Sequence, residues 1–298
     1  MDIFKTKPGV SRVIKINEKN FTEATKQEPP YSIDNKRGGL SHYAVCPECD
    51  NPIQIIGLFK NTPESGRKPY GKHHPNSIPD LAEYNADDYE DCIYSNPKWR
   101  KDKVRRRPNS KIEKKTLNLL REQFDRVIYV LSKDIGIHIS ANVAKKMLRI
   151  YIGEEGWRYR NATLNNLPWA FGETAPGLPL FGQSIIKDGE LHKAIALKCP
   201  EVHFEDSFSN YVRIKNREGK FIDLSYVMYN HQKNVENDIL HETIDLIVSR
   251  GRAPNVQTIF HKTIEIRTEY FLNLLCLPPE RAKRQEKFLD IAANMIKI

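Results

Sequence analysis

The fold of the N-terminal part follows from one short stretch, Cys46-Pro47-Glu48-Cys49, which places two cysteines on a turn. Such a pair brings two thiolates within reach of one tetrahedral metal ion. A later histidine, His73 or His74, and a later cysteine, Cys92, can complete a four-ligand site. Three of the five cysteines lie between positions 46 and 92, and this clustering favours metal binding over ordinary core cysteines.

Two other interpretations of this cysteine pair stay open. The thiols can lie unligated in a core, or the pair can do redox chemistry, which is typical of a Cys-x-x-Cys between a strand and a helix. Here Asn51-Pro52 follows the pair, and the apolar run from Ile53 to Phe59 predicts a strand. We expect a structural Zn²⁺ ion with these ligands: Cys46, Cys49, His73 and Cys92. The spacing does not distinguish His73 from His74. A closed site of this kind stabilises a fold and leaves no position for substrate.

Size and composition indicate a cytoplasmic globular protein. The 298 residues suffice for one large domain or two smaller ones. The chain has no run of about 18 apolar residues, so we expect no membrane contact. The start, Met1 to Lys5, lacks the apolar region of a signal peptide. An odd number of cysteines without a secretory signal fits a reducing cytosol.

The positive charge is concentrated in one segment. The net charge is +9, and residues 98–115 hold ten Lys or Arg against Asp102 and Glu113. Three interpretations remain open: a solvated linker or helix face, a phosphate-binding surface, or a docking site for an acidic partner. Trp99 and the run Arg105, Arg106 and Arg107 are the residues in question.

The chain divides into three expected parts, which together predict an α+β fold class. Residues 1–97 form a small zinc-ribbon-like module, 98–115 a basic linker or the start of a helix, and 116–298 an α+β domain with C-terminal helices. A short strand is expected at 12–16 and a short helix at 77–84. The apolar stripe from Leu117 to Leu131 predicts a helix that ends near Gly136, and a second helix begins after Ser140.

The second half of the chain mixes irregular and regular segments. Residues 157–190 are rich in Gly, Pro and Asn and predict a long loop, which either packs its own aromatics or presents them to a partner. Residues 210–215 and 220–229 predict a β-hairpin because Gly219 lies near the turn. Helices are expected at 234–249, 257–275 and 280–298.

No convincing catalytic motif is present, so we expect a non-enzymatic protein. The sequence lacks a phosphate-binding glycine loop, a Gly-x-Ser-x-Gly elbow and a His-Glu-x-x-His helix. Glu201, His203 and Glu205 alternate along an expected strand, where they can share one face. A metal-dependent nuclease site there is the weaker interpretation, and a polar strand edge is the stronger one.

The metal-ligand motifs resemble those of a known group of proteins. The segments 46–58, 69–73 and 92–94 are similar to a family from phages and integrated bacterial elements that includes the phage anti-Gabija proteins. The resemblance implies a non-catalytic inhibitor that binds the host Gabija nuclease–helicase defence complex as an oligomer. The matching residues are the expected metal ligands, so the resemblance supplies no partner-contacting residues.

The leading hypothesis is therefore a zinc-stabilised inhibitor of a host defence complex, working as a homo-oligomer in the host cytoplasm. A large protein interface needs about 800 Å² on each side, with aromatic and Arg anchors. The expected anchors are Trp99, Arg105, Arg106, Arg107, Trp157, Trp169 and Phe171. The alternative is a protein that binds nucleic acid directly through its zinc module and basic segment.

Overall fold

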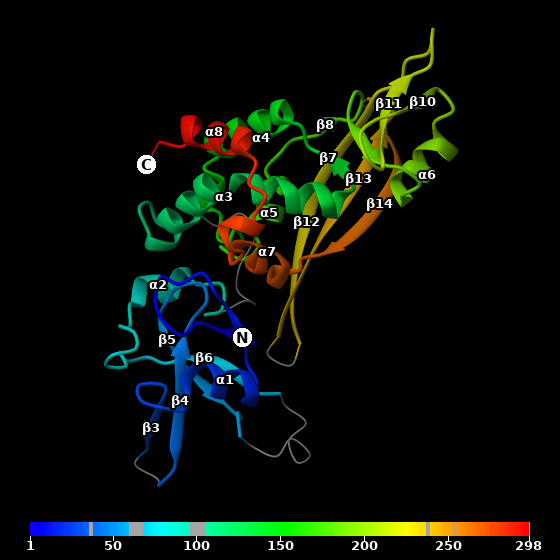
Figure 1. The fold of residues 1–298 in the computed structure, drawn as a ribbon. Coiled ribbons are helices and arrows are strands. Elements are labelled where there is room, and N and C mark those ends of the chain that lie inside the picture. The colour runs from blue at the N-terminus through cyan, green and yellow to red at the C-terminus, as the bar shows by residue number, and fades with distance from the viewer. Residues whose placement is uncertain (36–37, 60–67, 96–104, 237–238, 253, 298) are drawn as a thin grey trace.

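The computed structural model is a mixed α+β protein with antiparallel sheets, as the sequence predicts (Figure 1). It describes residues 1–297 except 36–37, 60–67, 96–104, 237–238 and 253. Two main hydrophobic cores account for most buried side chains among these residues. One core draws on residues between Met1 and Ile112, and the larger one on residues between Leu120 and Ile296. The fold therefore has a small N-terminal part and a larger C-terminal body.

The N-terminal part is built on a four-stranded antiparallel sheet in the order β3-β4-β5-β6. Its strands are β3 (Ser32–Asp34), β4 (Leu40–Val45), β5 (Pro52–Ile56) and β6 (Tyr70–His73). A two-stranded ribbon and two helices complete this part: β1 (Ile3–Phe4), β2 (Ile14–Lys15), α1 (Glu18–Thr25) and α2 (Ala86–Asp91). The strand expected at 12–16 is present as β2.

The prediction of a helix at 77–84 is wrong. Ile78 and Ala82 instead form an isolated antiparallel bridge around a turn in which Asp80 has a positive φ of 62°. The helix of this region, α2, begins later because the Asn85 side chain accepts the backbone N–H of Asp88 and caps it.

The two helices with clear apolar stripes are confirmed. They are α3 (Lys111–Ile135) and α4 (Ala141–Gly153), capped at their N-termini by the Ser110 and Ser140 side chains. α3 ends at Gly136, whose left-handed φ of 71° suits a residue without Cβ. Its apolar face forms the centre of the larger core, and Figure 1 shows it crossing the middle of the C-terminal body.

The region 157–190 is more regular than expected. It contains a 3₁₀ turn, one short helix and two short strands. The elements are η2 (Gly156–Arg158), α5 (Leu167–Glu173), β8 (Leu178–Pro179) and β9 (Ser184–Ile186), with α6 (Glu190–Lys198) directly after them. α5 is buried along most of its length because it packs between α3 and the sheet that contains β12.

Two further four-stranded antiparallel sheets lie in the C-terminal body, in the orders β10-β11-β9-β7 and β14-β13-β12-β8. Their remaining strands are β7 (Ile137–His138), β10 (Val202–Asp206), β11 (Tyr211–Asn216), β12 (Leu224–Glu236), β13 (Ile239–Arg250) and β14 (Gln257–Glu265). In Figure 1 the long strands β12 and β13 run as a twisted ribbon from the upper end of the body toward the N-terminal part.

Several expectations for this body are wrong. β11 and β12 do not pair as a hairpin, because they belong to different sheets. Residues 234–249 lie mostly in β12 and β13 rather than in a helix, and 257–265 form β14 before the helix α7 (Thr268–Leu275) begins. The terminal helix is shorter than expected, since α8 covers Glu286–Met295 and follows the 3₁₀ turn η3 (Pro279–Arg281). Short apolar runs rich in Ile and Val fit both the helical period and the strand period. Pairing with a neighbouring strand decides which structure forms.

Candidate metal centre

Four predicted ligands converge in the N-terminal part. The ligand atoms of Cys46, Cys49, His73 and Cys92 all lie within 4.8 Å of one another. The Sγ atoms of Cys46 and Cys92 are 3.7 Å apart, and Cys49 Sγ lies 3.3 Å from His73 Nε2. Zn–S bonds of about 2.3 Å in a tetrahedron place two sulfurs about 3.8 Å apart. The spacing of these atoms therefore suits one small tetrahedral ion.

Three separate elements bring the ligands together. The turn between β4 and β5 carries Cys46 and Cys49, and it is closed by the backbone N–H of Cys46, which donates to the carbonyl of Asn51 at 2.8 Å. His73 ends β6 and pairs in register with Ile53 of β5. Cys92 directly follows α2. The site thus depends on the sheet and the short helix being folded at the same time.

Only one of the two neighbouring histidines, His73, faces the cysteines. His73 directs its Nε2 atom at Cys49, whereas the His74 ring packs edge-on against Tyr43, with centroids 5.2 Å apart. Successive residues of a strand point to opposite faces, so only one of the two can reach the cysteines. The neighbouring Tyr89 ring supports His73 from the side, at 5.0 Å between centroids.

The three cysteines of the cluster are buried, His73 is half-buried, and the thiols differ in their pKa. Burial raises the pKa of the Cys46 and Cys92 thiols well above the usual range, because it disfavours the thiolate. Burial also acts to raise the pKa of Cys49. Hydrogen bonds from Cys46, Cys92 and His73 outweigh this effect and hold the pKa of Cys49 well below its usual range. The amide of Asn51 adds another donor, 3.3 Å from Cys49 Sγ. Three sulfurs and one imidazole are typical ligands of zinc, so these four residues can hold such an ion.

A buried carboxylate links this centre to the C-terminal body. Glu48 lies between the two cysteines of the turn, and its carboxylate accepts the backbone N–H of Leu164 at 3.2 and 3.4 Å. Burial raises the pKa of Glu48 to about 7, although Arg106 and Lys5 act in the opposite direction. The turn that carries two ligands is therefore attached to a segment more than a hundred residues later.

Arg106 strengthens this contact between the N-terminal part and the C-terminal body. The sequence predicts Arg106 to be a surface anchor, and this prediction is wrong. Its side chain is buried, with an exposed fraction of 1%. The guanidinium donates to four backbone carbonyls, those of Trp157, Tyr159, Arg160 and Ala162, at 2.6 to 3.3 Å. The planar fork of arginine suits such multiple contacts. Sequence reasoning missed this role because the residue stands in a strongly charged run.

The neighbouring arginines lie at the surface but have partners of their own. Arg105 contacts Glu155 at 3.1 Å and the ring of Tyr159, and Arg107 pairs with Asp87 and Glu90 of α2. Trp157, also expected to be an anchor, is partly buried and donates its indole N–H to Glu113 at 2.9 Å. Trp99, another expected anchor in this region, lies outside the residues that the structure describes.

Two other expected anchors belong to the core. Trp169 and Phe171 are fully buried in α5. The indole N–H of Trp169 donates to Asp134 at 2.9 Å, and the ring of Phe171 packs against Phe124 with centroids 5.4 Å apart. Of the two interpretations of residues 157–190, the one in which the segment packs its own aromatics holds for Trp169 and Phe171, and the expectation that they are surface anchors is wrong.

The structure does not assemble the acidic group considered as a nuclease site. His203 and Glu205 lie 3.5 Å apart on β10, but Glu201 pairs with Arg250 at 3.1 Å. In the described part of the chain, the four-residue cluster around Cys46 is the group of His, Cys, Asp and Glu side chains close enough to hold a metal ion.

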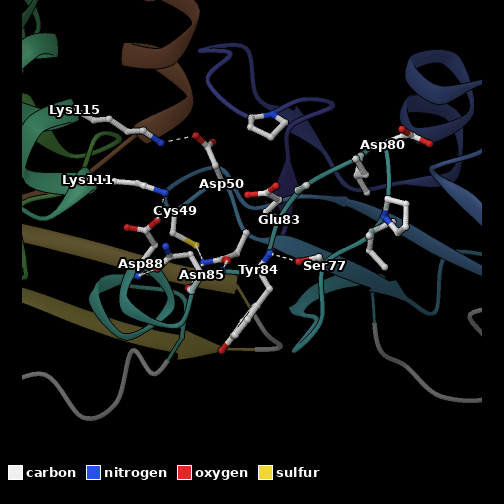
Figure 2. Close-up of a pocket in the computed structure, with 16 residues that line it drawn as sticks. Cys49, Asp50, Ser77, Asp80, Glu83, Tyr84, Asn85, Asp88, Lys111 and Lys115 are labelled. Carbon is white, nitrogen blue, oxygen red and sulfur yellow. Dashed lines mark hydrogen bonds and ion pairs between the residues drawn. The ribbon is translucent and has the colours of Figure 1, made fainter.

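A cleft that the sequence did not predict lies beside the metal centre. It has a volume of about 760 Å³ and extends from Cys49 to the loop at 77–85 and the start of α3. Figure 2 shows Asp50 facing Lys115, and Asp88 facing Lys111. Four carboxylates and two ammonium groups line this cleft, namely Asp50, Asp80, Glu83, Asp88, Lys111 and Lys115. Paired charges of both signs make it an unsuitable site for a polyanion.

Comparison with known proteins leaves the site to be interpreted from its own geometry. No protein-family model, no curated protein and no solved structure matches the chain. In the described residues, no helix is both long and apolar enough to cross a membrane.

Proposed function

We propose that this chain is a zinc-stabilised, non-catalytic binding protein of phage or mobile-element origin. In this proposal it inhibits a host nuclease–helicase defence complex of the Gabija type, as a homo-oligomer in the host cytoplasm. The motif resemblance around Cys46 and Cys92 supports the origin and the target. The metal has a structural role, because four protein ligands leave no open coordination position for a substrate.

One observation carries the choice of a protein interface. The three most exposed large apolar side chains among the described residues are Leu197, Phe221 and Val256, with exposed fractions of 81%, 73% and 54%. We call these three residues the apolar end. Exposed apolar side chains gathered in one place are typical of protein interaction sites.

Contacts of Arg250 and Gly251 connect the three segments that carry these residues. The apolar end lies where β12 and β14 begin and β13 ends, since Arg250 pairs in register with both Leu224 and Gln257. Arg250 also donates to the carbonyl of Lys198, the residue after Leu197, at 2.8 Å. The N–H of Gly251 donates to the carbonyl of Asp223 at 2.8 Å, which holds the segment after Phe221 against the turn that precedes Val256.

The alternative, direct nucleic-acid binding by the zinc module and basic segment, has less support. Arg105 and Arg107 are engaged in ion pairs, and Arg106 is buried against carbonyl groups. A phosphate contact by these residues would first have to break those interactions.

The test is reconstitution of the chain with a purified Gabija-type nuclease–helicase complex. We expect co-elution in size-exclusion chromatography after nuclease treatment and in high salt, together with loss of DNA cleavage by the complex. The double variant Leu197→Asp, Phe221→Asp should lose both effects while keeping its metal content and thermal midpoint. Leu40→Asp is the matched control, because Leu40 is 52% exposed on the N-terminal sheet. Full cleavage in the presence of excess wild-type chain would disprove the proposal.

A further inference from the structure

A second cavity, on the C-terminal body, has a different chemical character from the cleft in Figure 2. Its volume is about 260 Å³, and it lies between α3, β7, β11 and α8. Its lining includes four rings, one ammonium group and one amide: Tyr129, His138, Tyr211, Phe288, Lys133 and Gln285. None of the residues described as lining it carries a carboxylate.

Two aromatic rings at this cavity are open to solvent, whereas the ring of Phe288 is buried. Tyr129 is 45% exposed, and Phe208, at the rim, is 47% exposed. Phe208 stacks on Tyr211 with centroids 5.1 Å apart and planes inclined by 28°, and His138 meets Phe208 edge-on at 4.7 Å. The rings therefore support one another in fixed orientations while their outer faces stay accessible. Such a surface suits stacking with a planar ligand.

Two ammonium groups lie near these rings, and Lys133 also donates to the hydroxyl of Tyr270, outside the lining, at 2.8 Å. Lys133 Nζ lies 4.3 Å above the Tyr270 ring, and Lys287 Nζ lies 5.0 Å above the ring of Phe288. Burial, together with the nearby charge of Lys287, lowers the pKa of His138, so this imidazole is neutral at pH 7 and acts as one more planar ring. Aromatic faces next to ammonium groups fit a ligand that is both planar and anionic.

Other cavities lack this combination. The cleft beside the metal centre includes Asp50, Asp80, Glu83 and Asp88. A cavity of about 480 Å³ near the N-terminus is lined by Asp2, Glu242, Glu265 and Glu269. Carboxylates at those positions repel a phosphate. Among these three described cavities, only the aromatic one has a cationic lining without acidic groups.

We propose that this cavity binds one unpaired nucleotide of a single-stranded nucleic acid. The base stacks on the exposed ring of Tyr129 beside Tyr211, and the exposed ring of Phe208 extends the stacking surface for the next base. The phosphates lie near Lys133 and Lys287. This activity goes beyond the proposed inhibition of a protein complex, and the residues involved are distinct from those of the apolar end.

Fluorescence anisotropy with a labelled 12-nucleotide oligothymidylate tests this proposal on the full-length, metal-loaded chain. We expect Tyr129→Ala to weaken binding by about tenfold, as is typical of one lost stacking contact. Tyr229→Ala is the matched control, because Tyr229 is 44% exposed on β12 and lies outside the cavity. Lys133→Ala should reduce the slope of log affinity against log salt by about 0.7. A duplex of the same length should compete poorly, since its bases are already stacked.

Three results would overturn this site, and two of them are independent of the inhibition experiment. Equal affinities for the Tyr129→Ala and Tyr229→Ala variants would place any binding elsewhere. No binding of the oligothymidylate at low salt would remove the activity altogether. Loss of co-elution with the host complex in Tyr129→Ala, without oligonucleotide binding by the wild type, would make these rings a protein interface instead.

Discussion

The carboxylate of Glu48 accepts the backbone N–H of Leu164, which lies 116 residues further along the chain. Glu48 stands between two metal ligands, whereas Leu164 precedes the buried helix α5 of the larger core. Arg106 reinforces this connection by donating to carbonyls of the segment 157–162. The metal centre and the C-terminal body are therefore joined by partly or fully buried hydrogen bonds rather than by the chain connection alone.

Loss of a ligand should remove the metal and destabilise the N-terminal part. We expect about one equivalent of zinc in the wild type and far less in Cys92→Ser and His73→Ala, because three ligands bind zinc poorly. Elemental analysis after gel filtration and differential scanning calorimetry measure the two effects. Cys276→Ser and His74→Ala are the controls, since Cys276 is exposed and His74 packs on Tyr43. Zinc retained by Cys92→Ser at wild-type stability would contradict the site.

Removal of the Glu48 side chain should weaken the junction without emptying the metal site. Glu48→Ala leaves the N–H of Leu164 without its partner, which costs about 1–3 kcal/mol when the group is buried. Urea unfolding of the zinc-loaded protein measures the change in free energy. Glu83→Ala, at an exposed position, should change it little. Equal stabilities of the two variants would show that the Glu48 contact contributes nothing.

Two adjacent arginines should differ strongly in their effect on stability. Arg106→Ala deprives four carbonyls of their donor, and we expect a loss of at least about 3 kcal/mol. Arg107→Ala breaks only exposed ion pairs with Asp87 and Glu90, so it should cost less than about 1 kcal/mol. Chemical unfolding of both variants gives the comparison, and a reversed order would refute the assigned roles.

Acid should weaken the contact between α3 and the segment that leads into α8. Burial of Asp125 acts to raise its pKa, but hydrogen bonds from Arg284 and the N–H of Gln285 outweigh it and lower the pKa below the ordinary 3.8. The stabilisation is therefore present above about pH 4 and is lost as the pH falls through the lowered pKa. At pH 7, Asp125→Asn should be about 1–3 kcal/mol less stable than the wild type.

The measurement for Asp125 is the difference in unfolding free energy between variant and wild type as a function of pH. We expect this difference to shrink below about pH 4, because the Asp125 carboxyl of the unfolded wild-type chain then takes up a proton while the folded form still holds its charge. Asp290→Asn, at an exposed position on α8, provides the baseline for general acid effects. A difference that stays constant down to about pH 3 would mean that Arg284 does not hold the charged form.

The sequence predicted the parts of the fold that depend on local chemistry. Cysteine and histidine spacing favours Cys46, Cys49 and Cys92 as metal ligands over core or redox thiols, and it leaves His73 and His74 as alternatives for the fourth ligand. The apolar stripes of α3 and α4 predict helices because a period of about 3.6 residues persists over several turns. The sequence pattern of β13 and β14 predicts helices, because their closely spaced Ile and Val residues suit either structure until a partner strand pairs with them.

By itself, then, the sequence determined the cysteines and the histidine pair from which the metal cluster is built, the α+β class and the two long amphipathic helices. Only the tertiary structure decided that His73 rather than His74 faces the cysteines, that Arg106, Trp169 and Phe171 are buried, and that Glu48 contacts Leu164. The physical reason is distance along the chain. Ligand spacing and helix period are local properties, whereas burial and side-chain partners depend on which remote segments the folded backbone brings together.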